Sequence, residues 1–269
     1  MSLTIDGKTL NKLGLALLPG HEHPAAPSTR DYTVGIPGMP GAYDFGADLE
    51  PRPFTLPLLV KPQANEYLLA KKIRGIMQTF FDSYGKPKTV KLIYDYEPDK
   101  YYKVRYSGSL DTTRYKTMAN LVFPLTAFDP HAYSVTESTD DIFWRTDIPF
   151  TSDIPFGIQP SQYTITSPQT VNIDNLGFLV VRPVIEITGN ATDLTLTMNR
   201  EGFSFGSFTN ASFLIDGKTY TAIKNGQNFL SELKGNLEKI ELIPGKNAVK
   251  IGGTNLNINI AIKFHAKYM

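Results

Sequence analysis

The sequence predicts a mainly β protein in two parts, an N-terminal β-rich domain with one α-helix and a C-terminal antiparallel β-sandwich. Only one segment, Gln63–Tyr84, places apolar residues at helical spacing. After Tyr163, short β-prone runs separated by turn dipeptides recur roughly every ten residues, as in sandwiches. Nine of the nineteen prolines fall between Pro19 and Pro62, which excludes long helices from that stretch.

Composition limits the class of protein. A chain of 269 residues that is 41% hydrophobic and 20% charged is long enough for one large or two ordinary domains. The net charge of +1 gives no reason to expect nucleic acid, an anionic membrane or an acidic substrate. Cysteine is absent, so disulfides and thiolate chemistry are excluded. Neither a signal peptide nor an apolar run of membrane-spanning length is visible, so we expect synthesis in a cytoplasm and no membrane insertion.

The N-terminal half contains five expected elements. Leu3–Leu18 alternates and turns at the hairpin dipeptide Asp6-Gly7. Arg52–Lys61 is expected to be an edge strand, because Pro53 and Pro57 interrupt a two-sided ladder. The remaining elements are the helix that ends before Gly85, a tyrosine-rich hairpin (Lys88–Tyr96 and Tyr101–Ser109, turning at Glu97–Lys100) and a strand at Met118–Phe128.

The proline-rich segment is the most informative stretch. It cannot be an ordinary helix or central strand, yet it contains more apolar and aromatic residues than a disordered linker would. We interpret it as ordered chain that needs another surface to lie on, that of a neighbouring subunit. Deletion of Gly20–Asp48 is therefore expected to leave both domains folded and to abolish assembly.

The C-terminal half is punctuated by turn signals. They separate short β runs and are Asn199–Gly202, Asp216-Gly217, Asn225-Gly226, Pro244-Gly245 and Gly252-Gly253. The expected strands are Thr170–Ile173, Arg182–Gly189, Asp193–Arg200, Ala211–Ile215, Tyr220–Ile223, Lys239–Leu242, Ala248–Ile251 and Asn257–His265. A short repeat, Thr146–Phe150 and Ser152–Phe156, lies in a proline-rich linker. The expected domains are thus 1–135 and 163–269, joined by a linker at 136–162.

No motif indicates catalysis, a cofactor or a metal. Gly202–Gly206 matches G-x-S-x-G around Ser204, but the sequence continues as a strand, whereas a nucleophile elbow is followed by a helix. His21 and His23 are expected on a surface loop, and His131 and His265 lack a local serine or carboxylate partner. Asp95, Glu97 and Asp99, and the lysines and tyrosines of residues 86–116, are interpreted as a solvated or subunit-facing hairpin rather than a calcium or nucleic-acid site.

Taken in order, the motifs resemble the distal tail protein (Dit) family of siphophages. Those in the N-terminal half are Ile5–Lys8, Ile36–Asp44, Arg52–Pro57, Lys72–Ile76, Asp95–Ser107 and Ala127–Pro130. Those in the C-terminal half are Asn175–Gly177, Arg182–Ile187, Gly189-Asn190 and Leu242–Asn247. The resemblance spans nearly the whole chain. One departure is Met39-Pro40, where the family more often has a basic residue.

This resemblance implies a structural hub of the phage tail tip or baseplate without enzymatic activity. It implies a hexameric ring around a channel, with a galectin-like C-terminal sandwich outside it. The implied partners are further copies of the chain, the tail-tube protein, the tail-associated fibre or lysin protein and the tape-measure protein; the implied location is the virion. The expected oligomer-interface residues are Tyr32, Ile36, Pro37, Gly38, Met39, Tyr43, Arg52 and Arg105.

Two other function classes stay open at this point. A carbohydrate-binding protein would use the C-terminal sandwich, with Phe203, Phe205, Phe208 and Phe213 as candidate platform residues. The only tryptophan, Trp144, lies in the linker, which does not favour that hypothesis. A hydrolase would rest on Ser204 and on scattered carboxylates that the sequence does not pair with it.

Overall fold

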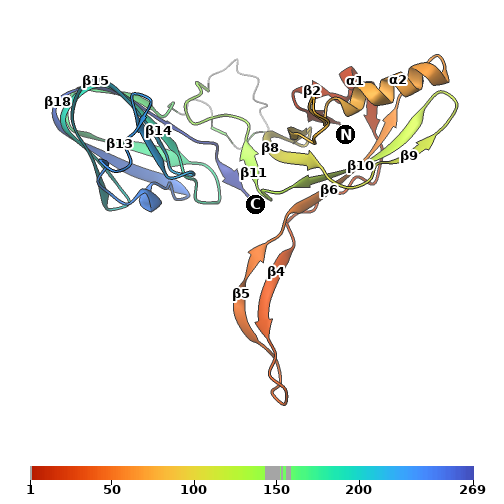
Figure 1. The fold of residues 1–269 in the computed structure, drawn as a ribbon, viewed down its shortest axis with the longest axis horizontal. Helices are drawn as coiled ribbons and strands as arrows, with labels where there is room; N and C mark the ends of the chain where they lie inside the picture. The colour runs from red at the N-terminus through yellow and green to blue at the C-terminus, as the bar shows by residue number, and fades with distance from the viewer. Residues whose placement is uncertain (1, 143–151, 153, 156–158) are drawn as a thin grey trace. The chain divides into compact units, whose positions relative to one another are not determined.

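The structure is a computed structural model that describes residues 2–142, 152, 154–155 and 159–269. The chain divides into an N-terminal unit, Met1–Ala132 with Met269, and a C-terminal unit, Tyr133–Tyr268. Antiparallel strands dominate both units, which confirms the predicted mainly β fold (Figure 1). In the described residues no helix has the length and apolar character needed to cross a membrane. The domain bounds 1–135, 136–162 and 163–269 remain a proposal, and Trp144 and most of the short repeat lie outside the described residues.

One antiparallel sheet organises the N-terminal unit, in the order β2-β1-β7-β8-β10-β6-β3, with β9 also paired to β10. Its strands are β1 (Leu3–Ile5), β2 (Lys8–Thr9), β3 (Leu15–Leu17), β6 (Arg52–Val60), β7 (Thr89–Tyr94), β8 (Glu97–Tyr106), β9 (Asp111–Arg114) and β10 (Ala119–Ala127). Alternate residues of β6 and β10 are buried, so one face of the sheet forms the core.

Strand β6 lies inside the sheet, so its prediction as an edge strand was wrong. It pairs along its whole length with β10 and, at Leu58–Val60, with β3. The carbonyl of Pro57 accepts a bond from Leu18 N at 2.8 Å, so Pro57 and, two residues earlier, Thr55 direct their backbone groups away from β10. Pro53 and Pro57 have no backbone N–H to donate. Because backbone groups alternate along a strand, these missing donors would point away from β10, to the side of β6 where pairing is only partial.

Two helices accompany this sheet, one more than was predicted. The short helix α1 (Leu10–Leu13) interrupts the expected alternation of Leu3–Leu18 and ends at Gly14, whose φ is 71°. The longer helix α2 (Glu66–Met77) begins at Asn65, whose side chain accepts a bond from Leu68 N at 2.9 Å. Buried Leu69, Ile73 and Ile76 form the predicted stripe, and α2 lies along one side of the sheet (Figure 1).

The tyrosine-rich hairpin turns two residues earlier than predicted. Tyr94 pairs with Glu97, so the turn is at Asp95-Tyr96 and Glu97–Lys100 belongs to β8. Asp99 is consequently buried and lies 3.7 Å from Lys100, where a solvated acidic residue had been expected. Tyr94, Tyr101 and Tyr102 are buried as well, so much of this hairpin belongs to the core and not to the surface.

The proline-rich segment contains a two-stranded hairpin, β4 (Thr29–Val34) and β5 (Tyr43–Leu49), that forms a sheet of its own. Every residue of both strands is exposed, and the hairpin extends away from the sheet of the N-terminal unit (Figure 1). We call this hairpin, residues 29–49, the arm. The sequence predicted ordered chain here but not strand structure.

In the C-terminal unit, one antiparallel sheet surrounds a single hydrophobic core, with the strand order β12-β18-β14-β15-β16-β17 and β13 paired to β18. Its strands are β12 (Gln162–Ile165), β13 (Gln169–Asn175), β14 (Val184–Met198), β15 (Glu201–Asp216), β16 (Thr221–Lys224), β17 (Gln227–Asn228) and β18 (Gly245–Lys263). A 3-10 turn, η1 (Leu237–Lys239), follows β17, and the short strands β11 (Ala132–Ser134) and β19 (Lys267–Tyr268) pair with each other outside this sheet.

Several predicted short strands are halves of longer ones. Arg182–Gly189 and Asp193–Arg200 belong mostly to β14, and Ala248–Ile251 and Asn257–His265 mostly to β18. Gly252-Gly253 is therefore an irregularity inside β18, not a turn, at the level where the register of β14 and β18 shifts. Lys239–Leu242 is not a strand, since only Leu242 forms a single bridge, to Val181. Asn225-Gly226 connects β16 and β17 as predicted.

Candidate assembly interface

The tip of the arm is a tight turn that the sequence encodes directly. The backbone N–H of Met39 donates to the carbonyl of Ile36 at 3.0 Å, closing a turn over Pro37 and Gly38. Gly38 has a φ of 87°, which the third position of a type II turn requires, and proline suits the second position. The prolines of this segment thus shape the connection between two strands.

Register gives the arm two different faces. Val34 pairs with Tyr43, so these side chains share one face with Tyr32 and Phe45. Thr33 pairs with Asp44 on the opposite face, which is polar. A bulge places two residues of β5, Phe45 and Gly46, opposite Tyr32, and Gly46 has a φ of 98°.

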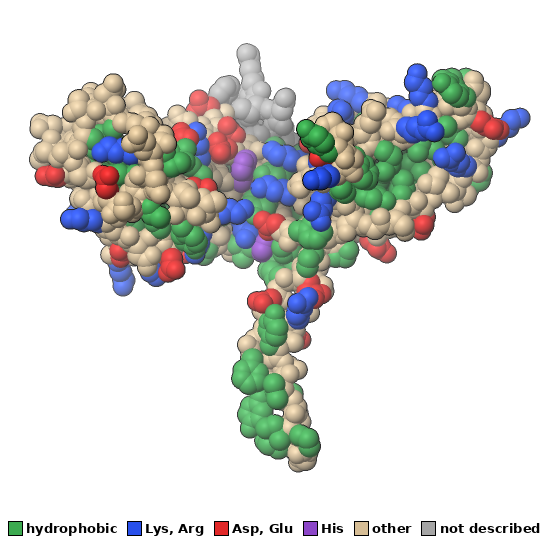
Figure 2. All heavy atoms as spheres, viewed as in Figure 1, with side chains coloured by type: hydrophobic (Ala, Val, Ile, Leu, Met, Phe, Trp, Pro, Cys, Tyr) green, Lys and Arg blue, Asp and Glu red, His purple; other side chains and the backbone are tan. Residues whose placement is uncertain are grey.

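The apolar face is fully open in this structure. Phe45 is 69% exposed and Tyr43 is 52% exposed, and Figure 2 shows hydrophobic side chains gathered along the distal half of the arm. A two-stranded hairpin alone is marginally stable in water, and its two outer edges carry unpaired backbone groups. This combination is typical of a surface that a partner covers.

Arg52 fixes the root of the arm to the sheet. Its guanidinium is only 1% exposed and donates to the carbonyl of Pro24 through Nε at 2.9 Å and also through Nη2. Nη1 donates to the carbonyl of Pro130 at 3.4 Å, and the group lies 5.0 Å from the centre of the Tyr102 ring. A planar, always charged side chain suits this mixture of carbonyl and aromatic contacts.

His23 lies beside Arg52, so the expectation of a free surface loop was wrong for this residue. Its ring stacks on Tyr94 at 4.6 Å, and its two nitrogens lie 2.7 Å from Tyr96 Oη and 3.0 Å from Tyr102 Oη. Burial, with smaller contributions from the charges of Arg52 and His21, lowers the pKa of His23 to about 4. Burial also raises the pKa of Tyr102 to about 12.

Sequence reasoning missed this cluster because its parts are far apart in the chain. His23 and Tyr102 are separated by 79 positions, and no local pattern links them. The only sequence signal for this cluster was the spacing of His21 and His23, because residues two apart lie on the same face of an extended chain.

The predicted interface residues fall into three groups. Tyr32, Ile36, Met39 and Tyr43 are exposed apolar residues of the arm, and Pro37 and Gly38 form its tip. Arg105 is exposed on β8, with its guanidinium 4.2 Å from the centre of the Phe128 ring. Arg52 is buried, so we assign it the positioning of the arm. The interface role of all eight residues remains a proposal.

The motifs weighed for catalysis are placed in ordinary structural surroundings. Ser204 lies within β15, and its backbone forms a bridge with Lys234. His131 does have a carboxylate partner, contrary to expectation, because its Nδ1 lies 2.8 Å from Asp129 Oδ1. Within the described residues, no group of three or more histidine, aspartate or glutamate side chains could hold a metal ion.

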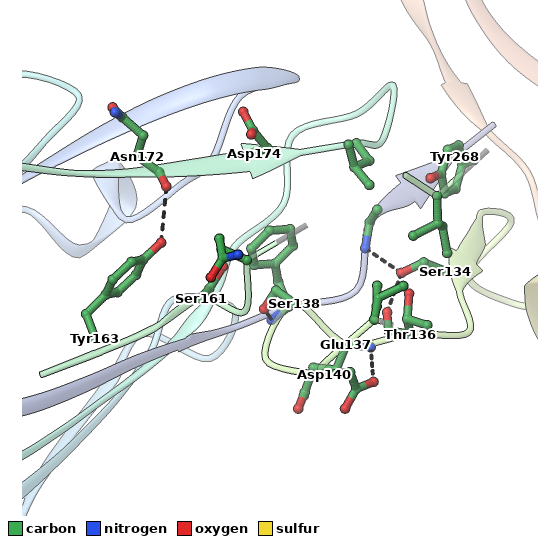
Figure 3. Close-up of a pocket in the computed structure, with 16 residues that line it drawn as sticks. Ser134, Thr136, Glu137, Ser138, Asp140, Ser161, Tyr163, Asn172, Asp174 and Tyr268 are labelled. Atoms are coloured by element: carbon green, nitrogen blue, oxygen red, sulfur yellow. Dashed lines mark hydrogen bonds between the residues drawn. The ribbon is translucent and has the colours of Figure 1, made fainter. Parts of the chain in front are cut away.

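A cavity of about 350 Å³ lies in the C-terminal unit (Figure 3). Two of its three serine hydroxyls are already engaged: Ser134 donates to the carbonyl of Thr136, and Ser138 donates to that of Ile262. Glu137, Asp140 and Asp174 stand at its edge. No histidine belongs to the described lining, so the arrangement lacks a serine–histidine pair for nucleophilic catalysis.

The phenylalanines considered for carbohydrate binding belong to the core. Phe203, Phe205, Phe208 and Phe213 are at most 8% exposed, and Phe208 and Phe213 pack edge to face at 4.8 Å. They do not provide an exposed aromatic platform.

Residues 8–125 match the family model of the phage tail protein RIFT-related domain. The whole chain has the fold of the SPP1 distal tail protein, Dit (gp 19.1), with a TM-score of 0.69 at 16% identity, covering 100% of this chain and 99% of that one. The resemblance expected from the sequence is confirmed.

SPP1 Dit is described as a paradigm of the hub adsorption apparatus in phages that infect Gram-positive bacteria. A chain of the phage P2 baseplate in its activated conformation with Ca aligns over 97% of both chains, with a TM-score of 0.42 at 10% identity. No curated protein matches the sequence.

Proposed function

We propose that this phage tail protein is a non-enzymatic hub of the tail tip or baseplate that forms a hexameric ring. The observation that carries the proposal is the arm, an ordered hairpin whose apolar face is exposed in the single chain. The likeness to SPP1 Dit supports a hub, since the two chains align over their whole lengths. The match of residues 8–125 to a phage tail domain supports a tail role, and in this proposal the ring is built from that domain.

The proposed ring uses heterologous contacts, in which a surface of one copy meets a different surface of the next. Such contacts close into a ring when the rotation between copies returns to the start. In the virion, the ring joins the tail tube to the tail-associated fibre or lysin protein and the host-adsorption apparatus, with the tape-measure protein as a further partner. Neither nucleic-acid recognition nor membrane insertion is part of this role.

The test is deletion of the arm. Glu50 N donates to Ser28 O at 2.8 Å, so these two residues are already cross-strand neighbours. Replacing 29–49 with Asn-Gly supplies a two-residue hairpin turn between them. This deletion is narrower than Gly20–Asp48, because Glu22 pairs with Thr55, and His23 and Pro24 contact the body of the unit.

We expect the arm-deleted protein to keep its circular dichroism spectrum and cooperative melting and to lose self-association. Light scattering over a wide concentration range, with negative-stain imaging of the largest species, measures this. A closed six-fold ring in the full chain and its absence in the deleted one supports the proposal. A ring that persists without the arm contradicts the arm as the assembly element.

A further inference from the structure

A basic groove lies between α1 and α2. It has a volume of about 440 Å³ and is lined by Lys12 from α1 and by Lys71 and Lys72 from α2. Leu13, Leu68 and Ile76 give it apolar walls. The two sides of the groove are in contact, because the Lys72 side chain reaches the end of α1. A Cβ added at Gly14 would lie 2.6 Å from the Cε of Lys72.

The positive charge of this groove is uncompensated. At 100° per residue, Leu68, Lys71, Lys72 and Ile76 share one face of α2, whereas Glu66 points to the opposite face. None of the ion pairs found in the described residues includes Lys12, Lys71 or Lys72. Figure 2 shows lysine and arginine side chains gathered over α1 and α2. The groove therefore attracts a ligand that is both acidic and partly apolar.

The arm has this chemistry. The arm, residues 29–49, contains one cation, Arg30, and three acids, Asp31, Asp44 and Asp48, and Glu50 directly after it adds a fourth acid. Arg30 and Glu50 neutralise each other at 3.1 Å, which leaves three aspartates uncompensated. These aspartates lie on the same hairpin as the exposed apolar face of Tyr32, Val34, Tyr43 and Phe45.

We propose that the arm of one copy docks in the α1–α2 groove of the next copy. The proposal rests on the ring function above and names the surface that receives the arm. Every residue of β4 and β5 is exposed, so the arm does not lie in the groove of its own chain. The contact joins two different surfaces, as a closing ring requires. Nucleic-acid phosphates would satisfy the lysines but not the apolar walls.

Charge reversal tests this pairing. The groove variant is Lys71→Glu with Lys72→Glu, and the arm variant is Asp31→Lys with Asp48→Lys. In each variant alone, groove and arm carry the same sign, and we expect the association constant to fall about a hundredfold. In an equimolar mixture every contact again joins opposite signs, so rings of alternating copies should form. All four reversals in one chain should restore assembly as well.

The matched control is Lys8→Glu with Lys116→Glu, which makes the same charge change at two exposed lysines outside the groove. We expect this control to assemble like the unmodified chain. If the groove variant also assembles normally, or if mixing fails to restore assembly, the arm–groove pairing is wrong. In that case, loss of assembly on arm deletion would leave the proposed ring function standing. A groove variant that assembles but loses binding to a DNA oligonucleotide would assign the groove to nucleic acid and overturn the pairing.

Photo-crosslinking gives a second reading that does not need complete rings. Phe45 is replaced by benzoylphenylalanine in the full chain, and the protein is mixed with an isotope-labelled copy at high concentration. We expect crosslinks between copies at 10–14 and 63–76, which border the groove. Crosslinks confined to one copy, or mapping to other segments, would overturn the proposal.

Discussion

At the scale of single residues, His23 links the root of the arm to the β7–β8 hairpin. Its neutral ring can accept one hydrogen bond and donate another, which matches the two tyrosine hydroxyls at its nitrogens. A protonated ring would be a second cation beside the Arg52 guanidinium. The fold therefore favours the neutral form.

This preference predicts a pH dependence of stability. The unfolded ring has a pKa near 6.5, whereas the folded one has a pKa of about 4, so between these values only the unfolded state binds a proton. The free energy of unfolding should be highest above pH 6.5 and should fall as the pH drops towards 4. Discounted for the half-burial of His23, the loss is about 1–2 kcal/mol.

Urea unfolding from pH 4.5 to 7.5 measures this loss, with His23→Phe as the comparison. The variant keeps an aromatic ring to stack on Tyr94 but has no group to titrate at this position. The difference in unfolding free energy between the two proteins should change with pH by the amount above. A constant difference would exclude His23 as the titrating group.

Tyr94 differs from His23, because its buried polar group has no hydrogen-bond partner among the described residues. Burial raises the pKa of this hydroxyl. Removing an unsatisfied buried group relieves its desolvation cost, so we expect Tyr94→Phe to be neutral or to stabilise by up to about 1 kcal/mol. Tyr102→Phe, which removes the hydroxyl bonded to His23, should instead destabilise by about 1 kcal/mol. Chemical denaturation of both variants would show whether the two effects differ in sign.

At the scale of elements, local turn chemistry was predictable and pairing partners were not. Asp6-Gly7 and Asn225-Gly226 have positive φ at both residues and form the turns that the sequence predicted. The role of Pro53 and Pro57 depends on which side of β6 is fully paired, which is decided by residues elsewhere in the chain. The arm was recognised as ordered but not as a hairpin, because the prolines of this segment argued against strands.

Gly189 marks an irregularity where β14 approaches β18 closely. Its φ is 129°, and a Cβ there would lie 2.2 Å from the carbonyl oxygen of Asn257. Gly189→Ala must therefore displace backbone as well as strain φ, and we expect it to destabilise the C-terminal unit by about 3 kcal/mol. Gly202→Ala is the matched control, since its Cβ would meet open space, and its effect should stay within about 0.5 kcal/mol. Equal effects in thermal denaturation would show that the close approach does not matter.

At the scale of the whole molecule, the sequence predicted a β-rich fold in two parts because its composition changes along the chain. The proline-rich N-terminal half and the evenly punctuated C-terminal half correspond to the two compact units. The residues that make the candidate interface were partly predictable, since exposed aromatics in a proline-rich stretch stand out in one dimension. The basic groove was not, because Lys12 and Lys71 meet only when α1 and α2 are packed together.

Two units with separate cores should unfold in separate steps. Arg52→Leu leaves the carbonyls of Pro24 and Pro130 without their donor, which should cost the N-terminal unit about 2–3 kcal/mol. Gly189→Ala acts in the C-terminal unit. At about 3 °C per kcal/mol for units of this size, each variant should lower one calorimetric transition by about 5–10 °C and leave the other in place. A single transition that both variants shift equally would show that the whole chain, and not each unit, is the cooperative structure on which assembly depends.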